Sequence, residues 1–363
     1  MKREKNKIKP IGKILFAAQD PGGFNSLAPV IKKIVRLGFS YKVFLAEGSL
    51  RFAEKTGIDF IDCSFLTLDK IIKKVDEFAP DIVVVATSDG LCLEKNIVAW
   101  AKKRAIFSVA LIDFWSRHNA RFSNPKTSDH AYIPDIICVV DAYMKKQIIA
   151  EGVAANKVKI TGNPFFESFG LVKKNNGHYI LFASQPFSEA RFRFREIANL
   201  PIFNEVEIFA DIVKILEEKN IRLPILIGFH PYSKNRNKYN KIIKKSKIKI
   251  IASGKETEKL IDQADLVIGI NTVILFQAAM MGKKVISYQP GIKPKEDPLF
   301  SNRLGLSLPA YGFKKLKQRL EEVFGQRQPL KKLAKIRGQY VFSRATDNVL
   351  GIINKSLAKA LKK

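Results

Sequence analysis

The sequence predicts an α/β protein made of two doubly wound parallel-sheet domains that face each other across a cleft. Apolar β-like runs alternate with amphipathic helical stretches along the chain. The runs are nearly continuous in Val and Ile, which indicates strands buried on both faces of a parallel sheet. The chain has 363 residues, more than the ~250–300 at which a single core stops growing. Two domains joined by right-handed strand–helix–strand crossovers are therefore expected.

The first half contains six β-like runs separated by helical patterns. The runs lie at residues 13–18, 41–46, 81–86, 107–112, 136–140 and 157–161, and the helical patterns at 26–37, 68–78, 94–104 and 142–151. This succession predicts an N-terminal domain over residues 1–165. It is the candidate acceptor side and carries the candidate base.

The pattern restarts after Gly162-Asn163-Pro164 and a polar segment at 173–177. The later β-like runs lie at 179–184, 224–229, 249–252, 266–269 and 285–288, with helical stretches at 205–219, 238–245, 256–263 and 272–281. Three basic helical stretches follow at 313–324, 329–341 and 346–361. We expect a second domain over residues 176–345, the nucleotide-sugar side, and a basic C-terminal helix over 346–363.

The charge of the chain is strongly one-sided. Lys and Arg number 63 against 34 Asp and Glu, a net charge of +29. Such a field attracts nucleic acid, an anionic membrane face or phosphorylated substrates, although part of the lysine content is equally explained by compositional drift. The basic C-terminus carries no nucleic-acid motif and no interleaved aromatic side chains. The first interpretation of the basic C-terminus is therefore a set of solvated helix faces. Contact with anionic lipid is the second, and nucleic acid is the least expected partner.

Cysteine usage and hydropathy predict a soluble, cytoplasmic protein with peripheral contact to the inner membrane face as a further option. The three cysteines are widely spaced, and neither CxxC nor Cys/His metal spacing occurs, so a reducing compartment fits best. The N-terminus leads straight into a β-like run without a signal sequence. The longest apolar stretch contains Asn271, Thr272 and Gln277 and is too short to span a bilayer.

Residues 265–288 are the most informative stretch of the chain. An apolar run ends at Gly269, the polar pair Asn271-Thr272 opens a helix, and Gly282 closes it before a second apolar run. A helix N-terminus favours an anion such as a nucleotide phosphate, through its unpaired N–H groups and its dipole. Gln277, inside this helix, is a further candidate contact, or an ordinary polar residue of a buried helix.

Two more candidates in the second half follow predicted strands. His230-Pro231 follows the run at 224–229, where the imidazole, cationic or neutral, can donate to a phosphate oxygen. The alternative is a histidine satisfied by loop carbonyls. Ser253 ends the next run and is a weaker candidate for contacting a base. Together, His230, Pro231, Ser253, Asn271, Thr272 and Gln277 make up the predicted nucleotide-sugar site.

In the first half, the candidates follow three of the strands. Gly22 and Gly23 lie in the first strand–helix turn, where glycine lets the backbone approach a substrate closely. Asp89 and Asp113 follow two later strands. A carboxylate at such a position faces the crevice of a doubly wound sheet and suits a general base once it is desolvated. The alternative for each is a helix cap or a loop hydrogen-bond acceptor.

The segment after Asp113 is rich in aromatic and basic side chains. It contains Arg117, His118 and Arg121 among Phe and Trp residues. Aromatic faces combined with cationic donors suit a sugar or a phosphorylated acceptor. We therefore expect these three residues to contact the acceptor or a phosphate.

These motifs together resemble the two-Rossmann GT-B superfamily over about residues 13–345. The chain is similar to bacterial surface-polysaccharide glycosyltransferases and to non-hydrolysing UDP-N-acetylglucosamine 2-epimerases. Residues 160–164, Ile-Thr-Gly-Asn-Pro, resemble a signature at the end of the first domain, and His230-Pro231 resembles the His-Pro motif that holds the nucleotide. Asn271-Thr272 falls where small polar residues contact phosphate. Gln277 falls where many members carry a ribose-binding glutamate.

The resemblance also bears on the carboxylates and on the reaction. Asp89 and Asp113 fall close to the acidic catalytic residues of the epimerases, and Ser88-Asp89-Gly90 resembles an acidic motif of some bacterial sialyltransferases. Two features depart from the epimerase pattern. Residues 271–277 lack its glycine pair and glutamate, and Ser184-Gln185-Pro186 replaces its basic, His-containing loop.

The resemblance implies a glycosyltransferase of cell-surface polysaccharide or lipopolysaccharide assembly that needs neither metal nor cofactor. Its partners would be a nucleotide-sugar donor and a glycan or lipid-linked acceptor. A UDP-sugar 2-epimerase is the first alternative. A non-catalytic protein that binds membrane or nucleic acid through its basic surface is the second.

Overall fold

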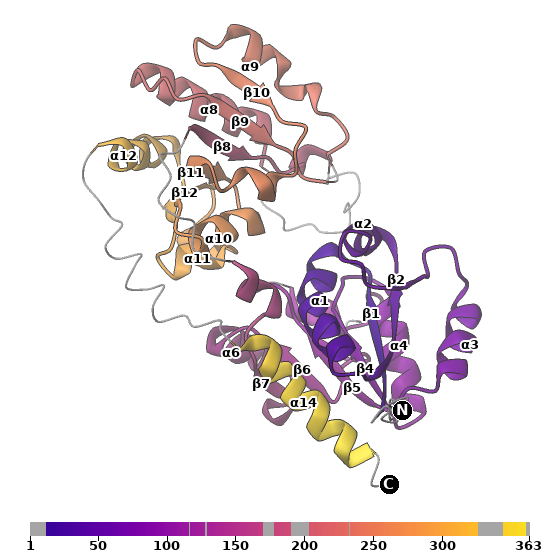
Figure 1. Cartoon of the computed structure of the whole chain (residues 1–363). Coiled ribbons are helices and arrows are strands. Elements are labelled where there is room, and N and C mark those ends of the chain that lie inside the picture. The colour runs from indigo at the N-terminus through magenta and orange to yellow at the C-terminus, as the bar shows by residue number, and fades with distance from the viewer. Residues whose placement is uncertain are drawn as a thin grey trace, which may run out of the picture. The chain divides into compact units, whose positions relative to one another are not determined.

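The computed structural model describes residues 12–115, 117–127, 129–169, 178–189, 203–231, 233–325 and 344–360. The chain divides into two compact units (Figure 1). Unit 1 comprises Met1–Ser168 and Phe342–Lys363, and unit 2 comprises Phe169–Val341. The predicted start of the second domain at residue 176 and the predicted helix at 329–341 lie outside the described residues.

Unit 1 is built on a seven-stranded parallel sheet with strand order β3-β2-β1-β4-β5-β6-β7. The strands are β1 (Lys13–Ala18), β2 (Ser40–Leu45), β3 (Ile61–Asp62), β4 (Ile82–Val85), β5 (Phe107–Leu111), β6 (Ile136–Val139) and β7 (Val158–Ile160). Six of them lie where apolar runs predict them, because side chains buried on both faces leave a near-continuous hydrophobic signal. The two-residue β3 is too short to leave one.

Helices cover both faces of this sheet. They are α1 (Pro21–Arg36), α2 (Leu50–Ala53), α3 (Leu68–Phe78), α4 (Leu93–Lys103), α5 (His118–Phe122), α6 (Ala142–Ala150) and α14 (Ala345–Ala360). The predicted helix at 26–37 in fact begins at Pro21. The pair Gly22-Gly23 has low helix propensity and obscures this start in the sequence, while proline in the first turn favours it.

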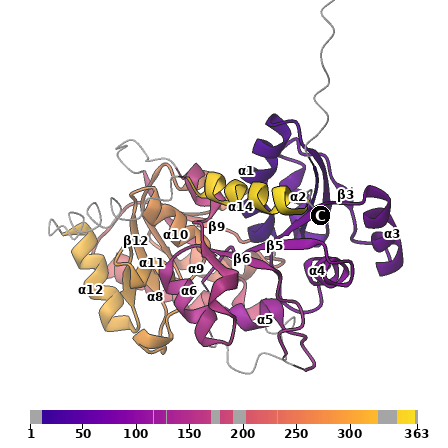
Figure 2. The same cartoon turned by 90° about the horizontal axis from the view of Figure 1, so that it is seen from below.

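The C-terminal helix α14 belongs to unit 1 and is not a separate basic element over 346–363. Val349, Leu350, Ile353 and Leu357 are buried in the same core as side chains of β1, β4 and α1. Figure 2 shows α14, in yellow, beside α1. The chain therefore returns to its first sheet because α14 carries an apolar stripe that unit 1 buries.

Unit 2 has a six-stranded parallel sheet with strand order β10-β9-β8-β11-β12-β13. The strands are β8 (Tyr179–Ala183), β9 (Ile225–Gly228), β10 (Ile250–Ala252), β11 (Ala264–Gly269), β12 (Lys284–Tyr288) and β13 (Leu308–Ala310). The last strand is not predicted because it is short and contains Pro309, which is tolerated at the edge of a sheet.

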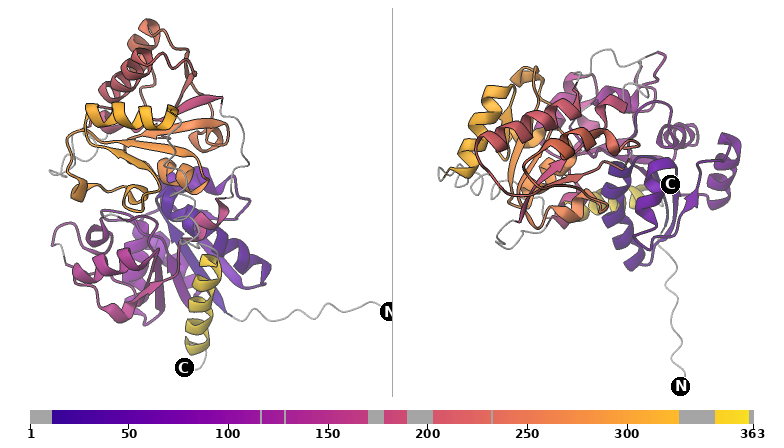
Figure 3. Two further views of the ribbon diagram at one scale, coloured as in Figure 1. Left: turned by 90° about the vertical axis from the view of Figure 1, so that its left-hand side faces the viewer. Right: turned by 90° about the horizontal axis from the view of Figure 1, so that it is seen from above.

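The helices of unit 2 are α8 (Glu205–Glu218), α9 (Asn240–Lys245), α10 (Val273–Met280), α11 (Phe300–Arg303) and α12 (Phe313–Phe324). Side chains of α8 and α12 join one core with those of the sheet, so both helices cover the same face (Figure 3). Where a helix is predicted at 256–263, only a 3₁₀ turn forms, over Thr257–Leu260.

Both sheets reverse their strand order at one point, between β1 and β4 in unit 1 and between β8 and β11 in unit 2. Doubly wound sheets bind ligands outside the carboxyl ends of the strands at such a switch point. The predicted class, two doubly wound parallel-sheet α/β domains, is therefore confirmed, and each sheet points to a particular place for a site.

Candidate functional site

At the switch point of unit 2, two side-chain amides join the ends of neighbouring strands. Gln185 follows β8 and Asn271 follows β11. The Nε2 of Gln185 donates to Oδ1 of Asn271 over 3.1 Å, and the backbone N–H of Asn271 donates to Oε1 of Gln185 over 2.9 Å. Asn271 also donates through Nδ2 to Oε1 of Gln289 over 3.4 Å. The predicted residue Asn271 thus belongs to a chain of three neutral amides.

The other end of this chain is tied to a buried carboxylate. Gln289 is fully buried, and its Nε2 donates to Oδ1 of Asp297 over 2.8 Å. Asp297 also accepts from Asn302 at 2.7 Å and from the Tyr311 hydroxyl at 2.9 Å. Because every link has a partner, the amides are held in fixed orientations.

Helix α10 begins immediately after Asn271. Thr272 is its N-cap, and the Thr272 hydroxyl oxygen accepts from the backbone N–H of Ile274 over 3.3 Å. This cap gives the buried Thr272 hydroxyl a hydrogen-bond partner. Gln277 lies half-buried inside the same helix. The eight-residue helix directs its first N–H groups toward the switch point, a favourable environment for an anion.

His230 lies two residues after β9 ends, followed by the exposed Pro231. Burial lowers the pKa of His230 to about 4, so the imidazole is neutral near pH 7 and offers one N–H donor. Of the two protonation states open in the sequence, the structure supports the neutral one. Ser253 is buried after β10 and accepts from the backbone N–H of Lys255 over 3.1 Å, so its side chain closes a local turn.

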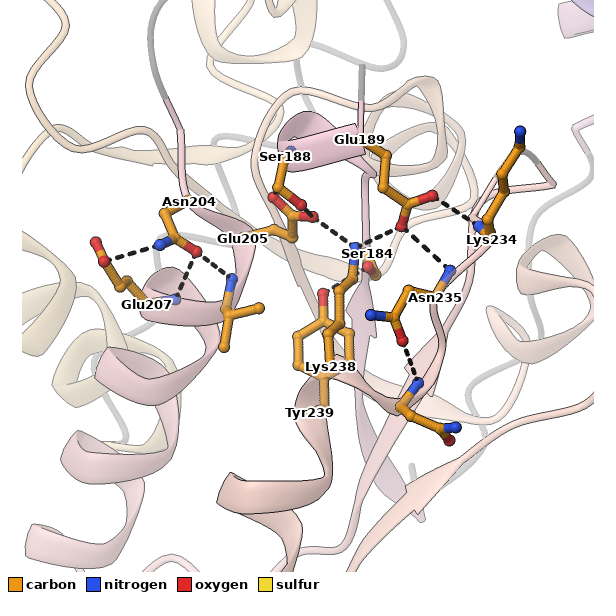
Figure 4. Close-up of polar contacts among 12 residues, drawn as sticks. Ser184, Ser188, Glu189, Asn204, Glu205, Glu207, Lys234, Asn235, Lys238 and Tyr239 are labelled. Carbon is orange, nitrogen blue, oxygen red and sulfur yellow. Dashed lines mark hydrogen bonds and ion pairs between the residues drawn. The ribbon is translucent and has the colours of Figure 1, made fainter. Parts of the chain in front are cut away.

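A buried ion pair anchors the segment that carries Gln185. Glu205, 0% exposed in the first turn of α8, pairs with Lys238, 8% exposed, over 2.5 Å. Glu205 also accepts from the backbone N–H and the hydroxyl of Ser188, at 3.0 and 2.5 Å. Figure 4 shows Lys238 between Glu205 and Glu189. The loop after β8 is thus fixed at both ends, by Gln185 on Asn271 and by Ser188 on Glu205.

At the switch point of unit 1, three carboxylates follow three strands. Asp20 follows β1, Asp89 follows β4, and Asp113 follows β5. Asp20 is the N-cap residue of α1, yet its side chain makes no cap hydrogen bond. It is exposed to solvent on one side, while the protein around it raises its pKa by desolvation. A hydrogen bond from Ser88 lowers the pKa of Asp20, and the charges of Asp113 and Asp89 raise it further.

The two predicted catalytic carboxylates are both paired with predicted arginines. Arg117 lies 2.9 Å from Oδ2 of Asp89, and Arg121 lies 2.7 Å from Oδ1 of Asp113. Arg121 also donates to the backbone oxygen and the hydroxyl of Thr87, at 2.9 and 2.8 Å. Arg117 has a left-handed backbone, with φ of 59°, which is uncommon outside glycine. The structure therefore pairs the predicted carboxylates with the predicted arginines, and their catalytic role stays a prediction.

Gly22 and Gly23 allow close packing at the start of α1. A Cβ atom on Gly22 would lie 2.2 Å from Oδ2 of Asp113, and one on Gly23 would lie 2.5 Å from Cβ of Ala86. The Asp113 carboxylate thus lies against the N-terminus of α1, where a negative charge is stabilised. The protein's own carboxylate lies where the sequence predicted close approach of a substrate.

His118 does not lie where the predicted acceptor contact needs it. It is 2% exposed, and its Nδ1 lies 3.2 Å from Oε1 of Glu151. The hydrogen bond from His118 lowers the pKa of Glu151. The residue is polar and neighbours two arginines in the sequence, but the first turn of α5 directs it into the protein.

Sequence reasoning did not assign a role to five residues of these sites, which are Asp20, Gln185, Ser88, Glu94 and Lys95. Gln185 was noticeable only as part of a loop that departs from the epimerase pattern. Glu94 and Lys95 are each 2% exposed, but a charged pair at the start of a helix predicts a solvated turn. Lys95 donates to the backbone oxygens of Gly90, Ala120 and Ser123 at 2.5, 2.8 and 2.9 Å. It ties the Asp89 loop to α5.

Metal-ligand clusters and membrane-spanning helices are both absent from the part of the chain that the structure describes. Within these described residues, no group of three or more His, Cys, Asp or Glu side chains is placed to hold a metal ion. The helices in the same ranges are all too short or too polar to cross a bilayer.

No protein-family profile matches the sequence, and no curated protein sequence matches it either. Solved structures, in contrast, share its fold. The UDP-GlcNAc 2-epimerase from Neisseria meningitidis, bound to UDP-GlcNAc, is 14% identical with a TM-score of 0.68, covering 96% of this chain and 100% of that chain. The UDP-GlcNAc 2-epimerase from Methanocaldococcus jannaschii, in complex with UDP-GlcNAc and UDP, is 17% identical with a TM-score of 0.58, covering 91% and 100%.

A glycosyltransferase structure matches this chain with a TM-score in the same range. The glycotransferase of kitacinnamycin is 12% identical with a TM-score of 0.65, and the match covers 96% of this chain and 100% of that chain. At these identities the likeness shows the fold alone. It confirms the predicted fold of two Rossmann-like parallel-sheet domains.

Proposed function

We propose that this chain is a GT-B glycosyltransferase that uses a nucleotide-activated sugar in cell-surface polysaccharide or lipopolysaccharide biosynthesis. The observation that carries the proposal is the switch point of unit 2, where Gln185 and Asn271 hold each other at the N-terminus of α10. Neutral amide donors and a helix N-terminus suit a diphosphate. Structures of the same fold that are bound to UDP-GlcNAc or UDP support a nucleotide sugar as the ligand class.

The donor half of the reaction takes place at unit 2. The N–H groups of α10, the Asn271 amide and the neutral His230 would stabilise the negative charge that develops on the leaving phosphate. Such donors act without reorganisation when they are already oriented, as the hydrogen bonds of Gln185 and Gln289 orient Asn271 here. This half of the mechanism requires no metal ion.

The acceptor half takes place at unit 1, with Asp20 as the general base. A base must be reachable and must bind a proton well enough to remove one from a hydroxyl. Asp89 and Asp113 are each paired with an arginine, so the protein's own cations already bind these two carboxylates. Asp20 is exposed, and its surroundings raise its pKa. Asp89 and Asp113 would then position the arginines and the acceptor.

A UDP-sugar 2-epimerase is the second candidate. The likeness in fold to two UDP-GlcNAc 2-epimerases favours it, as does the placement of Asp89 and Asp113 at one switch point. Gln277 in place of a glutamate and Gln185 in place of a basic loop weigh against it. An epimerase acts on the donor alone, whereas a transferase needs an acceptor.

Thermal shifts of the purified protein against UDP, CMP, GDP and their sugar conjugates test the donor site. A ligand at ~100 times its dissociation constant adds roughly 2.7 kcal/mol of apparent stability. We expect one nucleotide to shift the melting temperature in the wild type and to lose its effect in His230→Ala. An epimerised sugar formed from the donor alone would identify the isomerase. No shift with any nucleotide, together with salt-dependent binding to anionic vesicles or nucleic acid, would point to a non-catalytic binding protein.

Once a donor is known, the carboxylates can be ranked. Asp20→Asn should lower kcat by roughly 10²–10⁴, the usual contribution of general base catalysis, and leave the nucleotide shift unchanged. Asp89→Asn is the matched variant and should have a smaller effect. The reverse order would transfer the base assignment to Asp89. The membrane contact proposed for a lipid-linked acceptor is tested separately by flotation with anionic and neutral vesicles.

A further inference from the structure

Two loops of unit 2 leave the sheet from neighbouring strands. In the register of β8 with β9, Ala183 lies opposite Gly228. Gln185 and His230 each follow two residues later, so these two candidate contacts to the nucleotide begin adjacent loops. Loops are less constrained than strands. The separation of the two side chains therefore depends on contacts made further along each loop.

The carboxylate of Glu189 connects the two loops. Glu189 lies in the segment after β8, and its Oε2 accepts from the backbone N–H of Lys234, in the loop after β9, over 2.7 Å. Its Oε1 accepts from the backbone N–H of Asn235 over a longer 3.5 Å and from Nζ of Lys238 over 3.2 Å. Figure 4 shows these three hydrogen bonds meeting at Glu189. One carboxylate thus binds two consecutive N–H groups and an ammonium of the other loop.

The contact with Lys234 reaches His230 through a turn. The backbone N–H of Ser233 donates to the backbone oxygen of His230 over 2.9 Å. The next N–H along the chain, that of Lys234, is the one that Glu189 binds. Release of Lys234 from Glu189 would therefore loosen the turn that carries His230.

The segment that carries Glu189 is itself anchored in unit 2. Ser188, the preceding residue, donates from its backbone N–H and its hydroxyl to Glu205 over 3.0 and 2.5 Å. Lys238 is 8% exposed and pairs with the fully buried Glu205 over 2.5 Å. Since Glu205 already offsets the charge of Lys238, the buried ammonium does not require a second carboxylate. What Glu189 adds is the connection to the loop after β9.

We propose that Glu189 is a positioning residue that holds the loop after β9 against the loop after β8 and so keeps His230 in place beside Gln185. The inference rests on the proposed function, in which His230 contacts the nucleotide. Glu189 acts through His230 and not by touching the nucleotide. A free carboxylate would repel a phosphate, but the oxygens of Glu189 are engaged by the protein's own donors.

The first test follows the His230 imidazole in the ligand-free, full-length protein. Burial lowers the pKa of His230 to about 4. Glu189→Gln offers one acceptor oxygen in place of two, so the loop should open and the pKa of His230 should rise toward the ordinary 6.5. Loss of a negative charge alone would lower that pKa instead. The chain has four histidines, and NMR titration resolves the signal that is absent from His230→Gln.

Glu207→Gln is the matched control for this titration. It removes the same charge from an exposed residue of α8 whose carboxylate accepts from Asn204 over 2.8 Å. In Figure 4, Glu207 lies away from Lys234 and Asn235. The control should leave the pKa of His230 near 4. A His230 that titrates in Glu189→Gln as it does in the wild type would overturn the proposal.

Hydrogen exchange of the wild-type protein gives a test that needs no variant. Lys234 is exposed, and backbone N–H groups of exposed loops ordinarily exchange fast. Its hydrogen bond to Glu189 should give Lys234 a larger protection factor than Gly254, an exposed residue of the next loop. Equal protection of the two residues would mean that Glu189 does not hold the loop in solution, and this outcome too would overturn the proposal.

The link to the nucleotide is tested by a double-variant cycle. Glu189→Gln should weaken binding of the identified nucleotide by about tenfold. The same change in a His230→Ala background should have little further effect, because the residue that Glu189 positions is then missing. Equal losses in both backgrounds would show that Glu189 acts without His230 and would contradict the proposal. If no nucleotide binds the wild type, the proposed function fails, while the histidine titration still decides whether Glu189 holds His230.

Discussion

Gln185 and Asn271 exchange two hydrogen bonds across the switch point of the second sheet, at 3.1 and 2.9 Å. One bond uses the backbone N–H of Asn271, which lies directly before the N-cap of α10. Residues 86 positions apart thus set the entry to a helix whose N-terminus is the proposed phosphate site. The two hydrogen bonds thus connect the loop after β8, which has no recognised motif, to residues 265–288.

The variant Gln185→Glu should weaken nucleotide binding by about tenfold, or ~1.4 kcal/mol. The shape of the side chain is kept, but a negative charge is placed where the phosphate would bind. Isothermal titration with the identified nucleotide measures the change. Gln318→Glu adds the same charge on the exposed side of α12 and should leave binding unchanged. Equal effects in both variants would mean that net charge alone is responsible.

Acidification should destabilise unit 2 through His230. The pKa of His230 is lowered from 6.5 to about 4, so the unfolded chain binds a proton that the native protein does not bind in this range. Stability should therefore fall as pH decreases from 6.5 toward 4. The variant His230→Gln removes this contribution, and urea unfolding between pH 4.5 and 7 should show a shallower decline. A decline as steep as that of the wild type would contradict the buried, neutral state of His230.

The ion pair between Lys238 and Glu205 should show a large single-variant cost. Lys238→Met leaves the fully buried Glu205 as an uncompensated charge, and breaking such a pair costs about 3–5 kcal/mol. Adding Glu205→Gln removes the charge and should recover part of the loss, measured by chemical denaturation. The control Lys317→Met breaks the exposed pair with Glu218, and its effect should be slight. Additive losses in the double variant would show that the two residues are uncoupled.

Gly23→Ala should destabilise unit 1 by about 1–3 kcal/mol, since the new Cβ overpacks the contact between α1 and β4. That Cβ would lie 2.5 Å from Cβ of Ala86, a separation that requires the helix or the strand to move. The matched variant Gly254→Ala places its Cβ in open space and should be close to neutral. Thermal unfolding distinguishes the two. Equal melting temperatures of the two variants would show that α1 moves away from Ala86 without loss of stability.

Much of the fold was predictable because parallel strands buried on both faces leave a strong local signal. The strands β1 and β8 and the helix α3 lie within one residue of their predicted bounds. The misses have local causes. Elements of two to four residues, such as β3 and α2, are too short to repeat a hydrophobic period. The glycine pair hides the start of α1.

The sequence indicated which candidate residues follow strands, but it did not indicate which of them pair with one another. Asp89 and Asp113 were chosen because they follow strands, and the structure places both, with Asp20, around Arg121. The pairing of Asp113 with Arg121 depends on α5, a helix of five residues that brings Arg121 back to the sheet. A similar limit applies to His118, whose burial follows from the direction of its helix. Polarity alone gives no such information.

By itself, the sequence determined the two parallel sheets and the positions where polar residues interrupt them, because hydrophobic periodicity and turn chemistry act between near neighbours. Only the tertiary structure decided which polar groups meet. The contacts of Gln185 with Asn271, of Arg121 with Thr87, and of α14 with the first sheet join segments far apart in the chain. Such contacts depend on how sheets and helices pack, and burial then decides which groups stay charged.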